Sequence, residues 1–426
     1  MEKSNKNPWK GGLIQMKRRV VVTGMGAVSP LGNDVDTLWE NIKQGNSGIK
    51  LLESDEYQDI NTKIAGYIHD FPAEKYLDPK EIKRYDLFTQ YGFAAAMQAL
   101  EQANIDMDTI DKDRVGVYIG SGAGGLQTLL ENHKVLLEKG AKRVSPFAIP
   151  MSINNMVSGL VAIETGFRGP SFASVSACAT SNHAIGEAYV NIAHGYSDAI
   201  VAGGAEATIN PLYFAGFSKM RAMSTKNETP KEALRPFDAN RDGFVMSEGA
   251  GVLFLEEYEH AKKRGAAILG EIVGYGSTTD AYHITAPDYK GAAKAMKLAI
   301  ERAELKPEEV DYINAHGTGT PAGDISETKA IKEVFGEHAH QLRVSSTKSM
   351  TGHMFGAAGA VEAIITLKSM DENIFPATIN LKDPDPECDL DYVPNQTVEG
   401  NIEVALSNGF GFGGHNAVIA FKKYQF

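Results

Sequence analysis

The chain has 426 residues, which is enough for two domains or for one core of double size. Its 43% hydrophobic and 23% charged content is ordinary for a folded globular protein, and no apolar run reaches the ~18 residues of a membrane-spanning helix. The net charge of −12 disfavours binding to nucleic acid, so an acidic partner would need a local basic patch.

Strands and helices alternate along the whole chain. Residues 1–16 are polar and aperiodic, and we expect a disordered leader or an artificial extension there. The part from 17 to 266 predicts strands in RRVVVTGMGAV, RVGVYIGSG, PSFASVSA and DAIVAGGAEA, helices in DVDTLWENIKQG and YDLFTQYGFAAAMQALEQAN, and a strand followed by a helix in GVLFLEEYEHAKKRGA.

From residue 267 the pattern restarts. It predicts strands in ILGEIVGYGS and EVDYINA, helices in GAAKAMKLAIERAE and FGAAGAVEAIITLKSM, and a glycine-interrupted hairpin in EVALSNGFGFGGHNAVIAF. Each half thus has a strand that ends in a glycine-rich turn, then a helix, then a glycine-flanked strand. We expect a duplicated α/β architecture, packed as one rigid unit, with the functional site between the halves.

Cys178 falls where PSFASVSA gives way to a helix. Apolar residues at helical spacing follow it: Ala184, Ile185, Ala188 and Ile192. At a helix start, free amides and the positive end of the helix dipole favour a thiolate. A lone cysteine is more often an inert buried hydrophobe, so other motifs have to decide. Two cysteines cannot form a disulfide framework, and with no signal peptide recognisable we expect a cytoplasmic protein.

Three later stretches place polar residues among glycines. They are NAHGTGT with His316, SSTKSMTGHMFGAAGAVE with Lys348, His353 and Glu362, and NGFGFGGHN. Glycine lets the backbone approach a substrate closely and present its amides as donors. One cysteine and two histidines suit a covalent acyl-thioester intermediate, in which neutral imidazoles donate to a thioester carbonyl. A hydrolase would more often combine one histidine with an Asn or Asp.

Two other kinds of site find little support in the sequence. No HxxH, CxxC or HExxH pattern occurs, so we expect no metal. VVVTGMGAVSPLG lacks the GxGxxG spacing of dinucleotide loops, and Pro30 disturbs it further. GSGAGG in YIGSGAGGL has that spacing, but a lone glycine-rich turn is weak evidence and is better explained by close backbone packing, so we expect no nucleotide cofactor.

Several long motifs in a fixed order resemble the β-ketoacyl-acyl carrier protein synthases of type II. They are SACATS, RPFDANRDGFVMSEGAG, NAHGTGTPAGD, STKSMTGHMFGAAGAVE and NGFGFGGHNA. The resemblance covers 17–424. It implies a thiolase-like duplicated layered fold (α-β-α-β-α), with the nucleophile in the half 17–266 and the catalytic histidines in the half 267–426. It also implies decarboxylating condensation of an acyl group with malonyl-acyl carrier protein, in a cytoplasmic homodimer without a cofactor or metal.

The resemblance also assigns roles in the chemistry. Cys178 matches the acylated nucleophile, and His316 and His353 match the pair that supports decarboxylation and condensation. Lys348 matches the lysine of the site, and Glu362 matches its buried acidic partner.

Residues that bind the substrate and the carrier protein are implied in the same way. Phe412 matches a gating residue whose amide forms an oxyanion hole with that of Cys178. The substrate-binding positions are Thr318, Thr320, Ala123 and Phe410. The carrier-docking positions are Lys80, Lys83, Arg84 and Arg221. By spacing alone, the lysines and arginine of DPKEIKRYD, like those of KGAKRVSPF, would be ordinary solvated faces.

Alternatives remain within and beyond this family. Ala123 stands where type II enzymes usually carry isoleucine, so a type I-like synthase or a polyketide ketosynthase of the same chemistry stays open. A degradative thiolase would need a second cysteine in a glycine-rich loop, but Cys388 lies in the acidic DPDPECDLDY. A non-catalytic chain-length partner would lack Cys178. The segment 171–176 is the expected shared edge of a dimer.

Overall fold

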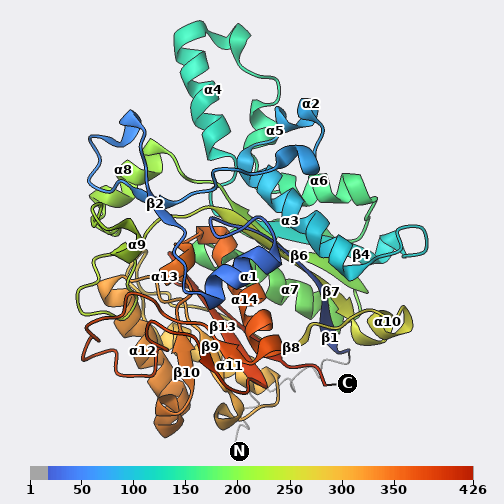
Figure 1. Cartoon of the computed structure of the whole chain (residues 1–426). Coiled ribbons are helices and arrows are strands. Elements are labelled where there is room, and N and C mark those ends of the chain that lie inside the picture. The colour runs from blue at the N-terminus through green and yellow to red at the C-terminus, as the bar shows by residue number, and fades with distance from the viewer. Residues whose placement is uncertain (1–17, 426) are drawn as a thin grey trace, which may run out of the picture.

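The computed structural model describes residues 18–425, so the predicted leader at 1–16 lies outside the described residues (Figure 1). Ten strands form one sheet in the order β10-β9-β13-β14-β8-β1-β7-β6-β4-β5. The strands of the first half are β1 (Val20–Val28), β4 (Val115–Gly120), β5 (Ser171–Phe172), β6 (Ala199–Glu206) and β7 (Gly249–Glu257). Those of the second half are β8 (Gly270–Thr279), β9 (Tyr312–Asn314), β10 (Arg343–Ser345), β13 (Val404–Gly411) and β14 (His415–Lys422).

The two sets of five strands have the same topology. The orders β1-β7-β6-β4-β5 and β8-β14-β13-β9-β10 share one pattern, in which two antiparallel pairings come first and the last three strands are parallel to one another. The sets meet where β1 pairs antiparallel with β8 from Val20↔Ile272 to Val22↔Gly270. The expected duplication is therefore visible strand by strand. The predicted boundary between residues 266 and 267 falls between α10 (Tyr258–Lys263) and β8.

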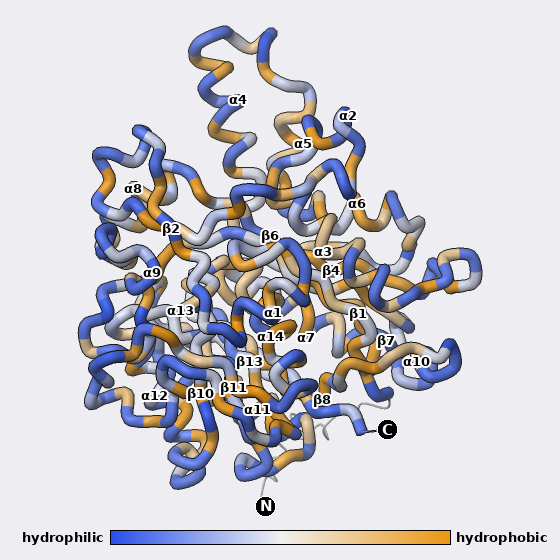
Figure 2. Tube along the Cα trace, viewed as in Figure 1, coloured by the Kyte–Doolittle hydropathy of each residue, from blue (hydrophilic) through white to orange (hydrophobic). Residues whose placement is uncertain are grey.

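Helices form three layers around these strands. α3 (Leu87–Ala103) and α6 (Met156–Thr165) cover the first set, whereas α11 (Tyr289–Arg302) covers the second and carries α12 (Pro321–Phe335). α7 (Thr180–Ala193) and α14 (Ala358–Glu372) contact strands of both sets. This is the predicted α-β-α-β-α layering, and the most apolar part of the chain lies in the middle (Figure 2).

The remaining α-helices and β-strands lie between these elements. They are α1 (Val35–Lys43), α2 (Pro79–Ile82), α4 (Leu126–Lys139), α5 (Ala148–Ser152), α8 (Pro211–Lys219), α9 (Pro230–Ala233), α13 (Lys348–Thr351), β2 (Ile49–Leu51), β3 (Ile64–Gly66), β11 (Ile374–Phe375) and β12 (Val398–Glu399). None of the helices within residues 18–425 is long and apolar enough to cross a membrane.

The buried strand predicted in PSFASVSA is wrong in length and in burial. Only Ser171–Phe172 pair with a neighbour, and both residues are exposed. β5 lies at the end of the sheet, so no further strand within residues 18–425 covers it. Val175 is 59% exposed.

The central helix α7 depends on a glycine that approaches a strand. A Cβ placed on Gly186 would lie 2.2 Å from the ring of Tyr275 in β8. No side chain fits in that gap, and the ring itself is 2% exposed. The helix therefore lies closer to β8 than any other residue type would permit.

We expect Gly186→Ala to destabilise the protein by about 1–3 kcal/mol because of overpacking, although alanine is the better helix former. The free energy of unfolding in urea measures this. Gly159→Ala in α6 is the matched control, because nothing lies within 4 Å of its added Cβ. The control should gain about 0.5–1 kcal/mol. Equal stability of Gly186→Ala and the unmodified protein would contradict the tight contact.

Candidate active site

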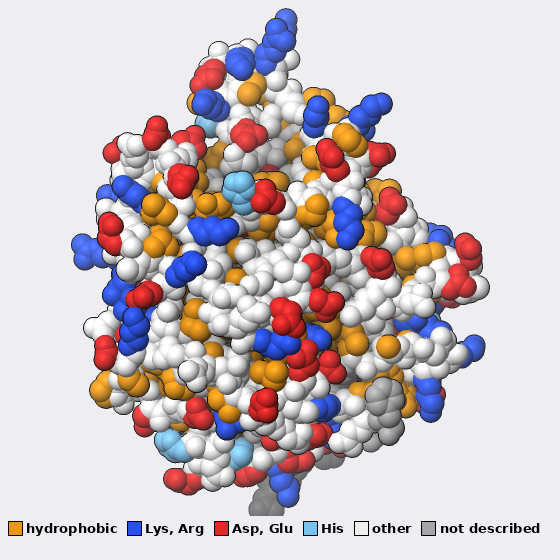
Figure 3. All heavy atoms as spheres, in the orientation of Figure 1, with side chains coloured by type: hydrophobic (Ala, Val, Ile, Leu, Met, Phe, Trp, Pro, Cys, Tyr) orange, Lys and Arg blue, Asp and Glu red, His pale blue; other side chains and the backbone are white. Residues whose placement is uncertain are grey.

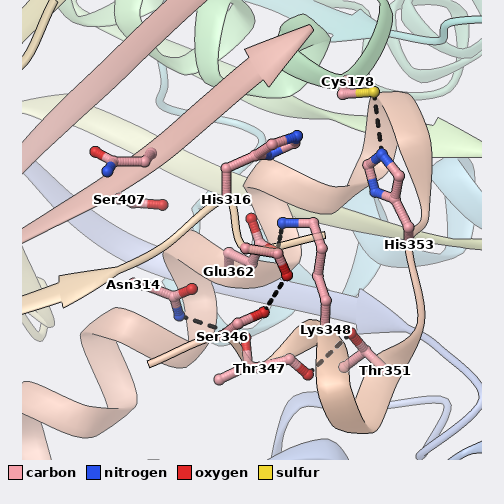
Figure 4. A network of polar contacts seen from close by, with 12 residues as sticks. Cys178, Asn314, His316, Ser346, Thr347, Lys348, Thr351, His353, Glu362 and Ser407 are labelled. Carbon is pink, nitrogen blue, oxygen red and sulfur yellow. Dashed lines mark hydrogen bonds and ion pairs between the residues drawn. The ribbon is translucent and has the colours of Figure 1, made fainter. Parts of the chain in front are cut away.

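A cavity of about 540 Å³ is lined by residues from both halves of the chain. This volume suits a small-molecule or cofactor-sized ligand. The lining includes the predicted residues Cys178, His316, His353, Thr318, Thr320, Ala123, Phe410, Phe412 and Arg221. Lys348 and Glu362 lie buried behind the two histidines (Figure 4).

Cys178 lies on a sharp turn in front of α7. The 3₁₀ turn Ala177–Ala179 leads directly into the helix, and Ala177 has a left-handed backbone with φ of 49°. Such a conformation costs an alanine roughly 1–2 kcal/mol. The end of β13 presses against this turn, since a Cβ on Gly411 would lie 2.5 Å from the carbonyl oxygen of Ser176. The backbone N–H groups of Phe412 and Cys178 both act on Sγ as a result.

Burial controls the ionisation of this thiol. Burial raises the pKa of Cys178 to about 12, although Lys348 and the amides of Phe412 and Cys178 lower it. The prediction that Cys178 is a thiolate because it lies at a helix start is therefore wrong: in the unliganded protein the side chain is a neutral thiol near pH 7. Desolvation outweighs the helix terminus because the side chain is 8% exposed. The Nε2 atom of His353 lies 3.0 Å from Sγ and can accept the proton when sulfur attacks (Figure 4).

Two different backbone contexts hold the histidines. His316 follows β9, as predicted, whereas His353 makes two strand-like backbone bonds, to Val245 at 2.8 Å and from Ser247 at 2.9 Å. The centres of the two imidazole rings lie 5.5 Å apart, and the ring planes meet at 85°. Burial and the charge of Lys348 lower the pKa of each well below its ordinary value. Both imidazoles are therefore neutral near pH 7, and each can donate one N–H.

Lys348 and Glu362 form a buried ion pair. Lys348 begins α13, Glu362 lies in α14, and the side chains are in direct contact. Lys348 is 0% exposed and Glu362 is 2% exposed. Burial raises the pKa of the Glu362 carboxyl, while its contact with Lys348 opposes that shift. The pair places a positive charge near the thiol and both histidines.

The same three side chains have the composition of a metal site. Ligand atoms of Cys178, His316 and His353 lie within 4.8 Å of one another. The charge of Lys348 acts on all three, and it would repel a divalent cation placed between them. The group fits proton transfer and hydrogen bonding better than metal binding.

The sequence reasoning missed two carboxylates that hold the His316 loop. Glu327 accepts the N–H of His316 at 2.9 Å and that of Gly317 at 2.7 Å. Asp324 accepts the N–H of Gly319 at 3.1 Å. Both residues are buried on α12, three positions apart. Two acidic residues at that spacing directly after NAHGTGT were the available signal.

The predicted substrate residues converge on the cavity. The hydroxyls of Thr318 and Thr320 lie 3.1 Å apart. Phe410 packs 5.8 Å from the ring of His316. Phe412 is 37% exposed and lies 6.3 Å from the ring of Phe217.

The predicted docking residues are not brought together on one chain. Arg221 lines the cavity beside α8, whereas Lys80, Lys83 and Arg84 lie on α2 and the turn after it. Figure 1 places α2 and α8 on opposite sides of the upper part of the molecule, and Figure 3 shows Lys and Arg side chains over α2 and α4. Arg84 lies 5.2 Å from the ring of Phe147.

A thiol beside two neutral imidazoles and two backbone N–H groups is an arrangement that suits acyl transfer through a thioester. The chain belongs to the β-ketoacyl synthase family. The family model "Beta-ketoacyl synthase, N-terminal domain" matches residues 17–261, and "Beta-ketoacyl synthase, C-terminal domain" matches residues 269–382.

Similar proteins are known by sequence and by structure. The chain is 51% identical over 411 residues to 3-oxoacyl-[acyl-carrier-protein] synthase 2 of Synechocystis sp., covering 96% of this chain and 99% of the relative. It is 50% identical over 414 residues to the protein of that name from Staphylococcus aureus, covering 97% and 100%.

Two solved structures extend the comparison. A β-ketoacyl synthase from Burkholderia phymatum is 36% identical with a TM-score of 0.90, covering 96% of this chain and all of that one. A type II polyketide ketosynthase solved with its acyl-carrier protein is 34% identical with a TM-score of 0.89 and the same coverage.

We expect the alkylation of Cys178 by iodoacetamide to rise about tenfold per pH unit from pH 6 to 9, without a plateau. With a pKa of about 12, the thiolate fraction grows over this whole range. The experiment uses Cys388→Ser, which removes the other thiol, itself 1% exposed. A plateau with its midpoint below pH 9 would contradict the effect of burial.

Proposed function

We propose that the chain condenses an acyl group with malonyl-acyl carrier protein and so elongates fatty acyl chains as a 3-oxoacyl-[acyl-carrier-protein] synthase. One observation carries the proposal: the 3.0 Å contact between the Cys178 thiol and the neutral His353, with His316 facing the same space. The relatives of that name share half of their residues with the chain, whereas the polyketide ketosynthase shares a third.

The first half-reaction loads the enzyme. Sγ of Cys178 attacks the thioester carbonyl of the acyl-carrier, and His353 accepts the thiol proton. The oxyanion forms beside the backbone N–H groups of Phe412 and Cys178. When it collapses, the C–S bond to the carrier breaks and the carrier thiol leaves with the proton.

The second half-reaction makes the carbon–carbon bond. The malonyl carboxylate leaves as CO₂, and its bonding electrons form an enolate of the carrier thioester. N–H groups of His316 and His353 stabilise the enolate oxygen. The enolate carbon then attacks the acyl carbonyl on Cys178, and the cysteine leaves as a thiolate that takes up one proton from solvent. The product is a 3-oxoacyl-carrier.

We expect single substitutions to separate the two half-reactions. Cys178→Ala should form no acyl-enzyme, whereas His316→Ala and His353→Ala should retain some acylation and lose CO₂ release by at least about 100-fold. Trapping with a labelled acyl-carrier and counting released CO₂ measure the two steps. Undiminished condensation in either histidine variant would overturn the assignment.

The pocket proposal concerns Ala123. It follows β4 and lines the cavity, where a small side chain leaves room for a substrate chain. Each methylene buried there is worth about 0.8 kcal/mol. Medium and long acyl chains should therefore load well.

Larger residues at this position should shorten the preferred chain. We expect Ala123→Ile to cause a modest loss and Ala123→Phe to overfill the pocket, which restricts loading to short chains. The ratio of kcat/KM for six-carbon and twelve-carbon acyl-carriers measures this. If Ala123→Phe left this ratio of kcat/KM values unchanged, Ala123 would not line the channel that holds the acyl chain.

We further propose a cytoplasmic homodimer. The exposed edge strand β5 and the α4 helix, which projects beyond the rest of the molecule, support a shared surface (Figure 1). Leu137 on α4 is 73% exposed. Both cysteines are free thiols, as a reducing compartment permits.

The basic residues of α2 and of the turn after it are proposed to dock the acidic carrier. We expect Lys83→Glu with Arg84→Glu to weaken carrier binding about tenfold or more, with a steep dependence on salt. Binding titrations at several salt concentrations measure it. Alkylation of Cys178 should stay unchanged, and its loss would point to misfolding in place of a docking defect.

A further inference from the structure

A buried carboxylate that the reaction above does not use lies in the wall of the cavity. Glu206 is the last residue of β6 and is 0% exposed. Its charge acts on Cys178 and on Tyr213. It has no basic partner in a salt bridge among the described residues, so hydrogen bonds hold it.

Four donors from two separate turns surround this carboxylate. Oε1 accepts from the Ser121 hydroxyl at 2.9 Å and from the Ala123 N–H at 3.0 Å. Oε2 accepts from the Gly122 N–H at 2.8 Å and from the Gly356 N–H at 2.9 Å. The first turn carries Ala123, and the second follows His353 by three residues.

Both turns are shaped to fit the carboxylate. A Cβ on Gly122 or on Gly356 would lie 2.8 Å from Oε2 of Glu206. Phe355, next to Gly356, has a left-handed backbone with φ of 44°, and its ring lies 4.9 Å from that of His353. The carboxylate thus connects the wall at Ala123 to the segment that carries a catalytic histidine.

We propose that Glu206 is a positioning residue that holds the Ser121–Ala123 wall at a fixed place relative to His353, and thereby sets the capacity of the cavity for long acyl chains. This inference rests on the proposed condensing function. Only an ionised carboxylate offers acceptors to all four donors. A glutamine offers one oxygen, and in either orientation its amino group would face at least one backbone N–H group.

The test compares Glu206→Gln with the unmodified enzyme in the acylation of Cys178 by two-carbon and twelve-carbon acyl-carriers. The twelve-carbon kcat/KM should fall tenfold or more, because that chain needs the wall in place. The two-carbon value should stay within threefold, because a short chain does not reach the wall. A ratio that stays unchanged, or an equal loss with both substrates, would overturn the inference.

Asp238→Asn is the matched control. Asp238 is also 0% exposed and accepts three backbone N–H groups, from Asn240 at 2.8 Å, Lys382 at 2.8 Å and Asp383 at 2.9 Å, but it does not line the cavity. The Asp238→Asn variant should have a lower unfolding temperature but the same ratio of twelve-carbon to two-carbon kcat/KM as the unmodified enzyme. The same shift of ratio in this control would overturn the inference as well.

A milder variant covers the case in which Glu206→Gln does not fold. Ser121→Ala removes one of the four donors and no charge, and it should move the ratio in the same direction by a smaller factor. If the unmodified enzyme accepts neither acyl-carrier, the proposed function fails. If it accepts both and neither variant moves the ratio, only the role of Glu206 fails.

Discussion

The whole site depends on how closely backbones from both halves approach the start of α7. Added Cβ atoms on Gly120 and Gly204 would lie 2.5 Å and 2.9 Å from Thr180 and Ser181. From the second half, Cβ atoms on Gly359 and Gly409 would lie 1.7 Å and 2.3 Å from Asn182. Side chains at the first two glycines would push α7 away from β4 and β6, and side chains at the last two would push the second half away from α7. The glycine-rich motifs are therefore a packing requirement first, and the site between the halves is its consequence.

This packing also explains the electrostatics. The approach of both halves excludes water from Cys178, His316 and His353, and desolvation then favours their neutral forms. The charge of Lys348 close to all three is compensated by Glu362. A buried site strengthens each hydrogen bond offered to a developing oxyanion or enolate, since little solvent competes for it.

Sequence reasoning reached the layers, the duplication and the site-forming side chains, because these leave local signals. Cys178 follows a predicted strand into the start of a helix, His316 follows one into a glycine-rich turn, and the helices around them have clear apolar spacing. Contacts between distant segments leave no such signal. The bonds of Glu206 to Ser121 and Gly356 span 85 and 150 positions, and burial of the Cys178 thiol needs β13 to arrive from the other half. Because such contacts cannot be read from the sequence, the predictions of a Cys178 thiolate and of a longer, buried strand at β5 were wrong.

The raised pKa of Cys178 means that the sulfur would become anionic only while it attacks. A free thiolate would be a better nucleophile, but burial away from water disfavours its charge. In the proposed reaction the thiol gives its proton to His353 on attack and avoids this cost, and the acylated sulfur carries no charge where the enolate forms. The histidines are neutral when malonyl enters, so they can donate to the enolate without first binding the malonyl carboxylate as cations. The order of the two half-reactions then follows from ionisation: acylation removes the titratable thiol before charge builds up beside it.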